Sequence, residues 1–435
     1  MKSTTKVVLA TVISSALYGQ TSTTNAPVYN ISTVAGIAST GDFNPNDPTS
    51  GRANSAVLIQ PDAVVFDFAG NMYVADSAAH RVRRVDAVTG VVTTVAGTGN
   101  NNYSATEDSG RAAVNARLNT PAGLAFDPAG NLYIVDKGNH RIRKVDSAGN
   151  ITTVAGEAPI NNNTGAPQNV NGGTTNGYAG DNRLATFAHL NSPSAISFDP
   201  AGNMYIADTA NNRIRKVSTN GIISTFAGTG ISNSGTSGGG FSGDGGPAVL
   251  ARLNAPEGIL ADVNGNVFIG DTANNRVRLV TPNGIITTIA GACLPLATRN
   301  PVTGQILPTP CTTGTAGPTN NASSVGFGFP GIGGGDQGPA TSAALFSPRG
   351  LALDVNGNLY IADAGNNRIR VVSPSGIISS FAGGGTLGDG SQALRASLSN
   401  PRFVAIDPTT GNVVIADSNN GRVRAVDPST LVIRN

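Results

Sequence analysis

The sequence predicts an all-β fold, and three observations support this prediction. The chain has 435 residues, of which 56 are glycine and only 12% are charged, a composition typical of turn-dense β proteins. One motif, an apolar run followed by an aspartate, a four-residue turn and Arg-x-Arg, occurs six times. Between its copies, short apolar runs alternate with Asp-Pro-x-Gly-Asn and Asn-Gly turns, which is the pattern of strands joined by tight hairpins.

Each copy of the motif is anchored on an aspartate before the turn and an arginine after it. The copies read VADSAAHRVRRV, IVDKGNHRIRKV, IADTANNRIRKV, IGDTANNRVRLV, IADAGNNRIRVV and IADSNNGRVRAV. The pairs are Asp76 and Arg81, Asp136 and Arg141, Asp208 and Arg213, Asp271 and Arg276, Asp363 and Arg368, and Asp417 and Arg422. We expect each pair to face across a hairpin as a cross-strand ion pair. Its repetition favours a structural role, because a catalytic group is needed only once.

Each repeat unit contains four apolar runs and therefore predicts a four-stranded antiparallel meander. Consecutive meanders predict a β-propeller, in which each sheet packs on its neighbours. The sixth unit lacks the strand ending in Ala-Gly, whereas residues 30–36 (NISTVAG) supply such a strand alone. We therefore expect one six-bladed β-propeller of four-stranded antiparallel blades over residues 30–435, closed by strands from both chain ends. Residues 431–433 are also apolar, so the end that supplies the outermost strand stays open.

The connection between one unit and the next has absorbed every insertion, the longest at about residues 292–347. In a four-stranded blade this connection emerges on the same face as the motif turns, so this insertion-bearing face is the predicted binding surface. The insertions end alike, as in GDGGPAVLARLNAP, which predicts one short capped turn. This glycine-rich segment lacks the Gly-Lys-Ser/Thr of a phosphate-binding loop.

The residue before each motif arginine is His, Asn or Gly, and these types tolerate a positive φ. We expect left-handed backbone there rather than imidazole chemistry, although His80 and His140 lie in neighbouring units and could share a metal. The candidate binding residues on this face are His80, His140, Asn211, Asn212, Asn274, Asn275, Asn366 and Asn367.

The N-terminus has the layout of a secretory signal peptide, with lysines in MKSTTK followed by the apolar stretch VVLATVISSALYG. We expect a signal peptide at residues 1–19, a linker at residues 20–29, and a secreted or periplasmic protein without a membrane span. Cys293 and Cys311 both lie in the long insertion. In an oxidising compartment we expect them to form a local disulfide.

The segments Pro-x-Gly-(Leu/Ile)-Ala-(Phe/Leu)-Asp, Gly-Asn-(Leu/Met)-Tyr-(Ile/Val)-Ala-Asp and Asn-(His/Asn)-Arg-(Ile/Val)-Arg-Lys-Val resemble NHL repeats over essentially all of residues 30–427. The resemblance implies a β-propeller. Proteins similar in this way include interaction modules, RNA-binding repressors, extracellular sensor domains and peptide-amidating lyases. In the lyases the resemblance implies zinc held by channel histidines, for which His80, His140 and His189 would have to converge.

The net charge is only +2 and like charges form no runs, so the composition does not require a nucleic-acid partner. The second motif arginines are expected to pair with the anchor aspartates between blades: Arg83, Arg143, Arg215, Arg278, Arg370 and Arg424. No catalytic trio stands outside the repeats. The sequence thus favours a monomeric binding or scaffolding module for a protein or glycan, without cofactor or metal, and the alternative is a metal-dependent lyase or hydrolase acting at the channel mouth.

Overall fold

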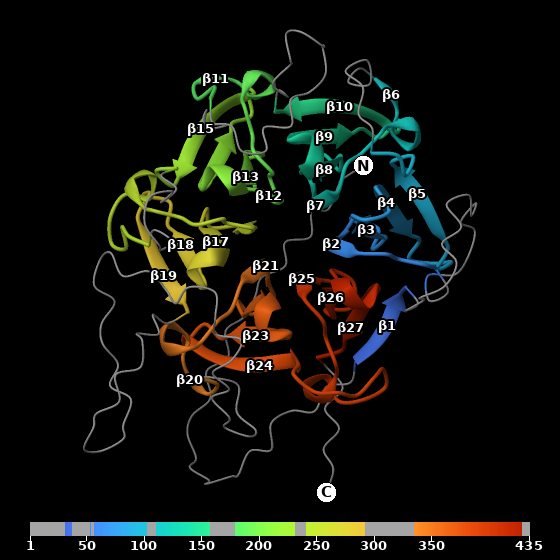
Figure 1. Cartoon of the computed structure of the whole chain (residues 1–435), viewed down its shortest axis with the longest axis vertical. Helices are drawn as coiled ribbons and strands as arrows, with labels where there is room; N and C mark the ends of the chain where they lie inside the picture. The colour runs from blue at the N-terminus through green and yellow to red at the C-terminus, as the bar shows by residue number, and fades with distance from the viewer. Residues whose placement is uncertain are drawn as a thin grey trace, which may run out of the picture.

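The fold is a six-bladed β-propeller, seen along its axis in Figure 1. A computed structural model describes residues 31–36, 53, 56–101, 110–156, 179–230, 241–291 and 335–428. The predicted signal peptide and linker, both cysteines and residues 431–433 lie outside these ranges. Within the described ranges no helix is both long enough and apolar enough to cross a membrane.

Each blade is an antiparallel meander whose strands pair in chain order, apart from the blade that closes the ring. The first three blades are β2 (Pro61–Phe66), β3 (Met72–Asp76), β4 (Arg81–Val85) and β5 (Val92–Ala96); β7 (Pro121–Phe126), β8 (Leu132–Asp136), β9 (Arg141–Val145) and β10 (Asn150–Ala155); and β12 (Ala195–Phe198), β13 (Met204–Asp208), β14 (Arg213–Val217) and β15 (Ile222–Ala227). The next two are β16 (Gly258–Ala261), β17 (Val267–Asp271), β18 (Arg276–Val280) and β19 (Ile286–Ala290); and β21 (Pro348–Leu353), β22 (Leu359–Asp363), β23 (Arg368–Val372) and β24 (Ile377–Gly383).

The sixth blade closes the ring as predicted, with strands from both ends of the chain. It consists of β25 (Pro401–Ile406), β26 (Val413–Asp417), β27 (Arg422–Val426) and β1 (Ile31–Ala35). β1 pairs with β27, with Ile31 opposite Val426. The N-terminal strand is therefore the outermost strand of this blade.

Three blades carry a fifth strand that the sequence did not predict. β6 (Arg111–Ala112), β11 (Arg183–Leu184) and β20 (Gly338–Pro339) each pair with the outermost strand of the blade that follows them in the chain. Each is followed by a 3-10 turn: η3 (Ala113–Asn115), η5 (Ala185–Phe187) and η9 (Ala340–Ser342). Two more insertions end in η7 (Ala248–Leu250) and η11 (Ala393–Arg395). These are the short turns that the alanine-rich ends of the insertions predict.

The core lies between neighbouring blades. One buried cluster joins Ala207 and Ile214 to Ile259 and Ile269 of the following blade, so both faces of each sheet are apolar, as expected for blades stacked around a ring. Aromatic rings add edge-on contacts between blades, as between Tyr73 and Phe126, whose ring centroids lie 5.0 Å apart. Such pairs contribute about 0.5–1.5 kcal/mol beyond the area they bury.

The strand register defines the two faces of the disc. Pro61, at the start of an innermost strand, pairs with Asp76, whereas Phe66, at its end, pairs with Met72. The motif turns and the insertions therefore emerge on one face, the insertion-bearing face. The turns between the first and second strands of each blade form the opposite face, which we call the short-turn face.

Candidate functional site

The residue before each motif arginine has the left-handed backbone predicted for it. The φ angles are 53° for His80, 56° for His140, 52° for Asn212, 56° for Asn275, 53° for Asn367 and 60° for Gly421. His and Asn at these positions therefore share a backbone requirement with Gly.

The same side chains also join neighbouring blades, which the sequence analysis missed. His80 Nδ1 accepts a hydrogen bond from the Thr120 backbone N–H at 3.1 Å, and His140 Nδ1 accepts from the Ser192 N–H at 2.9 Å. Asn212 Oδ1 does the same for Ala255 at 2.7 Å. Asn275 and Asn367 accept from Ser347 at 2.8 Å and from Asn400 at 2.7 Å. We call these bonds the inter-blade latch.

The sixth blade has no side chain to provide this latch, because its residue is Gly421. Gln60, the residue that would donate, instead bonds to Asp76 Oδ1 of its own blade at 2.9 Å. The sequence does contain the signal for the latch. His and Asn share a hydrogen-bond acceptor as well as tolerance of positive φ, and the one glycine stands where the ring closes.

The asparagine one position earlier in the motif binds the anchor aspartate. Asn211 and Asn274 each donate through Nδ2 to the Oδ2 of Asp208 and Asp271, both at 2.9 Å, and Asn366 donates to Asp363 at 2.8 Å. Each candidate binding residue thus already uses one side-chain polar atom within the protein. Whether this face binds a partner stays a prediction.

Replacing both His80 and His140 by Asn should leave the free energy of unfolding within about 0.5 kcal/mol of the wild type. Asn tolerates the backbone and supplies an acceptor for the latch, as Asn212 does. Val should cost about 2 kcal/mol or more for the pair, because it is strained at positive φ and leaves the donors unbonded. Urea denaturation measures both variants. If replacing both histidines by Asn clearly lowered the free energy of unfolding, the result would contradict the latch and favour a ligand role for the imidazoles.

Acid sensitivity provides a second test of the same variant. Burial lowers the pKa of His80 and of His140 below their usual value of 6.5, and Arg81 lowers that of His80 further. As the pH falls below about 6.5, the unfolded chain binds protons first, so these residues make the folded state lose stability. The wild type should therefore lose more stability than the Asn variant between pH 7 and pH 5. Both proteins contain the same buried aspartates, so the contribution of these acids to the pH dependence cancels when the two losses of stability are compared.

The anchor aspartates and motif arginines lie opposite each other as predicted, but the ion pair comes from a different arginine. Asp271 is in register with Arg276, yet its Oδ2 lies 3.3 Å from the Nη1 of Arg278. The same holds at Asp136 with Arg143 at 3.4 Å and Asp208 with Arg215 at 3.3 Å. Two further pairs are Asp363 with Arg370 at 3.6 Å and Asp417 with Arg424 at 3.5 Å. These pairs lie within one blade and not between blades, which corrects the prediction.

A second carboxylate, from the end of the insertion, contacts the same arginine. Arg215 lies 2.6 Å from Asp181 and Arg278 lies 2.5 Å from Asp244. Arg370 pairs with Asp336, and Arg424 lies 2.7 Å from Asp389. These aspartates belong to the Gly-Asp of GDNR, GDGG, GDQG and GDGS. The glycine-rich segment thus fastens the insertion to the blade through an Asp–Arg–Asp triad.

The anchor aspartates are fully buried, and burial raises the pKa of Asp136, Asp208 and Asp363 to about 6. Hydrogen bonds to each carboxylate and the charge of the nearby arginine lower its pKa and partly offset this rise. Each carboxylate also accepts a backbone N–H of the incoming connection, as Asp271 does from Asn254 at 2.8 Å. These buried acids hold the connections in place, and none of them lines either of the two cavities described below.

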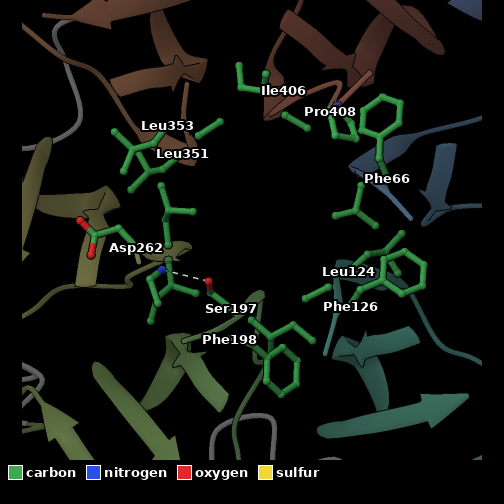
Figure 2. A pocket seen from close by; sticks show the side chains of 18 of the residues that line it. Phe66, Leu124, Phe126, Ser197, Phe198, Asp262, Leu351, Leu353, Ile406 and Pro408 are labelled. Carbon is green, nitrogen blue, oxygen red and sulfur yellow. Dashed lines mark hydrogen bonds between the residues drawn. The ribbon is translucent and has the colours of Figure 1, made fainter. Parts of the chain in front are cut away.

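The central channel opens on the short-turn face as an apolar chamber of about 590 Å³. Figure 2 shows Phe66, Leu124, Leu351 and Ile406 around the opening, each from the innermost strand of a different blade. The few polar groups are engaged: Ser197 Oγ accepts from the Ala261 N–H at 2.9 Å. The turn aspartates bond to their own turns, as Asp262 does to Asn264 and Asn266.

Apolar residues also rim this chamber on the outside, one following the aspartate of each first turn. Phe68, Pro128, Pro200, Val263 and Pro408 line the chamber mouth, and Val355 occupies the equivalent position in the remaining blade. Phe68 is 84% exposed, Val263 83% and Val355 100%. Proline fits the second position of such a turn by its fixed φ, whereas Phe and Val have no such backbone reason. Their exposure marks a surface that the fold itself does not require.

The channel ends on the insertion-bearing face in a small polar cavity of about 30 Å³, which we call the vestibule. Phe403 lines both the chamber and the vestibule. The equivalent position is Ala63, Gly123, Ala195, Gly258 or Gly350 in the other blades. A large side chain thus occupies this position in the sixth blade alone, and it lies between the apolar chamber and the polar vestibule.

The three histidines occupy separate positions in the fold. His80 and His140 face the connections of different blades through their latch bonds, and His189 lies in the segment after η5, where its backbone N–H bonds to Ala179. Among the described residues, no group of three or more His, Cys, Asp or Glu is arranged to hold a metal ion.

Two family models match the chain. A model of the teneurin NHL domain matches residues 104–174, 173–238, 236–307 and 331–387, which together make up more than half of the chain. A model of the NHL repeat matches residues 398–425.

Curated relatives match over part of their length. Teneurin-1 of Mus musculus is 30% identical over 248 residues, covering 54% of this chain and 8% of teneurin-1. Teneurin-4 of Mus musculus is 31% identical over 262 residues, covering 57% of this chain and 9% of that protein. Protein SUPPRESSOR OF QUENCHING 1, chloroplastic, of Arabidopsis thaliana is 26% identical over 326 residues, 74% of this chain and 26% of that protein. The chain thus spans a small part of the length of these relatives.

Solved structures share the fold at low sequence identity. An auxiliary nutrient binding protein from Bacteroides thetaiotaomicron superposes with a TM-score of 0.57 at 13% identity, covering 92% of this chain and 76% of that chain. One from Bacteroides ovatus superposes with a TM-score of 0.55 at 14% identity, covering 92% and 77%.

Proposed function

The chain belongs to the NHL-repeat family of β-propellers, and we propose that it is an extracytoplasmic binding module whose ligand enters the apolar chamber on the short-turn face. The observation that carries this proposal is the chamber with its exposed apolar rim. A volume of about 590 Å³ falls in the range of small-molecule sites, and such sites have mostly apolar linings.

The chemistry of the chamber favours an aromatic or aliphatic small molecule. A glycan would bring hydroxyl groups that need partners, whereas Ser197 and the turn aspartates already have theirs. Unpaired polar groups are costly to bury. The sequence favours a protein or glycan partner on the insertion-bearing face, but the side chains named for it are engaged in the latch and the anchors. We therefore place the ligand at the opposite mouth.

Export is part of the same proposal. It rests on the signal-like layout of residues 1–19, and a disulfide between Cys293 and Cys311 would form in that compartment. The auxiliary nutrient binding proteins of Bacteroides share the fold, and their description supports a binding role for a propeller of this shape.

Binding of N-phenyl-1-naphthylamine, a neutral apolar fluorophore, tests the chamber. The wild type should enhance its fluorescence and blue-shift it in a saturable way. A variant with Phe68→Ser, Val263→Ser and Val355→Ser should bind about tenfold more weakly or worse, because the rim loses apolar contact area. These side chains are 83–100% exposed, so the variant should keep the stability of the wild type.

The matched control is Val88→Ser, which removes an apolar side chain that is 94% exposed on the turn between β4 and β5, away from the channel. It should bind the fluorophore like the wild type. The proposal fails if the wild type gives no saturable enhancement, or if the triple variant and Val88→Ser behave alike.

A further inference from the structure

The vestibule differs from the rest of the molecule because the repeat does not dictate its residues. The position after the first proline of each blade faces the channel. Its six occupants, one per blade, are Asp62, Ala122, Ser194, Glu257, Arg349 and Arg402. Ala122 shows that a blade needs no charge at this position. Four charged residues at this position, in a chain with only 12% charge, are therefore not dictated by the repeat.

Two ion pairs join neighbouring blades across the vestibule. Arg349 Nη1 lies 2.5 Å from Glu257 Oε2, and Arg402 Nη1 lies 2.7 Å from Asp62 Oδ2. The Nε atoms of both arginines are buried and have no hydrogen-bond acceptor among the residues that the structure describes. Each guanidinium thus retains a donor that its carboxylate partner does not use.

Lys137 adds a fifth charge to the vestibule. It is the first residue of η4 (Lys137–Asn139), where four of the other five blades carry a hydroxyl and the fifth carries Ala364. Thr209 donates to the Pro256 carbonyl of the next blade at 2.8 Å, and Thr272 donates to the Pro348 carbonyl at 2.7 Å. Among the described residues Lys137 makes no such inter-blade bond, and Ala364 shows that a blade does not need one, so the repeat does not dictate a lysine here.

Lys137 has no ion-pair partner in the part of the chain that the structure describes. Burial raises the pKa of Asp62, and the charges of Arg402 and Lys137 oppose this rise, so Lys137 lies near the acid without pairing with it. The vestibule contains three cations (Lys137, Arg349 and Arg402) and two carboxylates (Asp62 and Glu257). Its formal charge is therefore 3 − 2 = +1.

We propose that the vestibule binds one small carboxylate, with Lys137 as its counter-charge and Arg349 and Arg402 as hydrogen-bond donors. A monoanion balances the excess charge of +1, whereas a dianion exceeds it. The planar carboxylate matches the fork of guanidinium donors. A cavity of about 30 Å³ holds roughly two water-sized groups, which suits the two oxygens of a carboxylate, and Phe403 closes the site towards the chamber. This site is independent of the chamber.

Acetate is the probe that tests this site. The thermal midpoint is measured while acetate replaces fluoride at constant ionic strength, with chloride and phosphate in parallel series. The wild type should show a saturable rise with acetate, and Lys137→Met should reduce the apparent affinity at least tenfold. Glu257→Gln raises the charge of the vestibule by one and should tighten acetate binding.

The control is Lys216→Met, which removes a lysine that lies over the Tyr205 ring, 5.3 Å from its centroid, on a hairpin away from the channel. It should respond to acetate like the wild type. The proposal is overturned if acetate gives no saturable rise, if Lys137→Met and Lys216→Met respond equally, or if phosphate binds more tightly than acetate.

Discussion

Replacing Arg278 by Met is expected to lower the free energy of unfolding by about 3–5 kcal/mol, the usual cost of breaking a buried ion pair from one side. The Arg278 side chain is fully buried, 3.3 Å from Asp271 and 2.5 Å from Asp244. Methionine fills much of the same volume but leaves two carboxylates without a cation, and Asp271 is itself completely buried. Urea denaturation at pH 7, followed by circular dichroism, measures the loss.

Two controls separate the triad from ordinary ion pairs. Arg84 pairs with Asp86 at 3.0 Å with both side chains more than a quarter exposed, so Arg84→Met should cost less than about 1 kcal/mol. Arg278→Lys should still be harmful, because an ammonium cannot replace the planar fork that contacts two acids. If Arg278→Met cost no more than Arg84→Met, the triads would not fasten the insertions.

The sequence shows the anchor aspartate and the two motif arginines, but neither how they pair nor that an insertion aspartate joins them. Arg276 and Arg278 project from the same side of β18, and both are long enough to reach Asp271. Asp271 is in register with Arg276, but the diagonal neighbour on the partner strand is also within reach of a long side chain. Both guanidinium groups lie near the Phe241 ring, that of Arg276 at 3.8 Å and that of Arg278 at 4.7 Å from its centre. Arg278 is the one that also contacts Asp244 at the end of the insertion.

The strands, the ring closure and the left-handed turns could be predicted because each is repeated along the chain. The chamber could not, because its lining residues, such as Leu124 and Leu351, read as ordinary core residues of buried strands. A signal was present in the turns, where Phe68, Val263 and Val355 replace the proline of other copies. Residues that depart from the repeat, in these turns and at Lys137 and Phe403, therefore indicate candidate binding sites better than the repeated residues do.

Deleting residues 20–36 is expected to cost at least about 3 kcal/mol, because the deletion removes β1 and opens the ring. Ile31 is fully buried, and truncating one such side chain typically costs about 2–5 kcal/mol. Ile31 also packs in the cluster shared with the preceding blade, while Ala35 packs in the cluster shared with the following one. The loss of β1 therefore weakens two interfaces and leaves β27 as a free edge.

Two further variants make the ring-closure test specific. Deleting only residues 20–29 stops short of β1 and should leave the urea midpoint unchanged. Ile31→Ala keeps the backbone pairing with β27 and should lose only part of the stability that the longer deletion loses. The longer deletion should also aggregate more readily, because an uncovered edge strand pairs with other chains. If deleting residues 20–36 and deleting residues 20–29 gave the same midpoint, β1 would not hold the ring closed, and the six-bladed ring would have to be stable with three strands in its last blade.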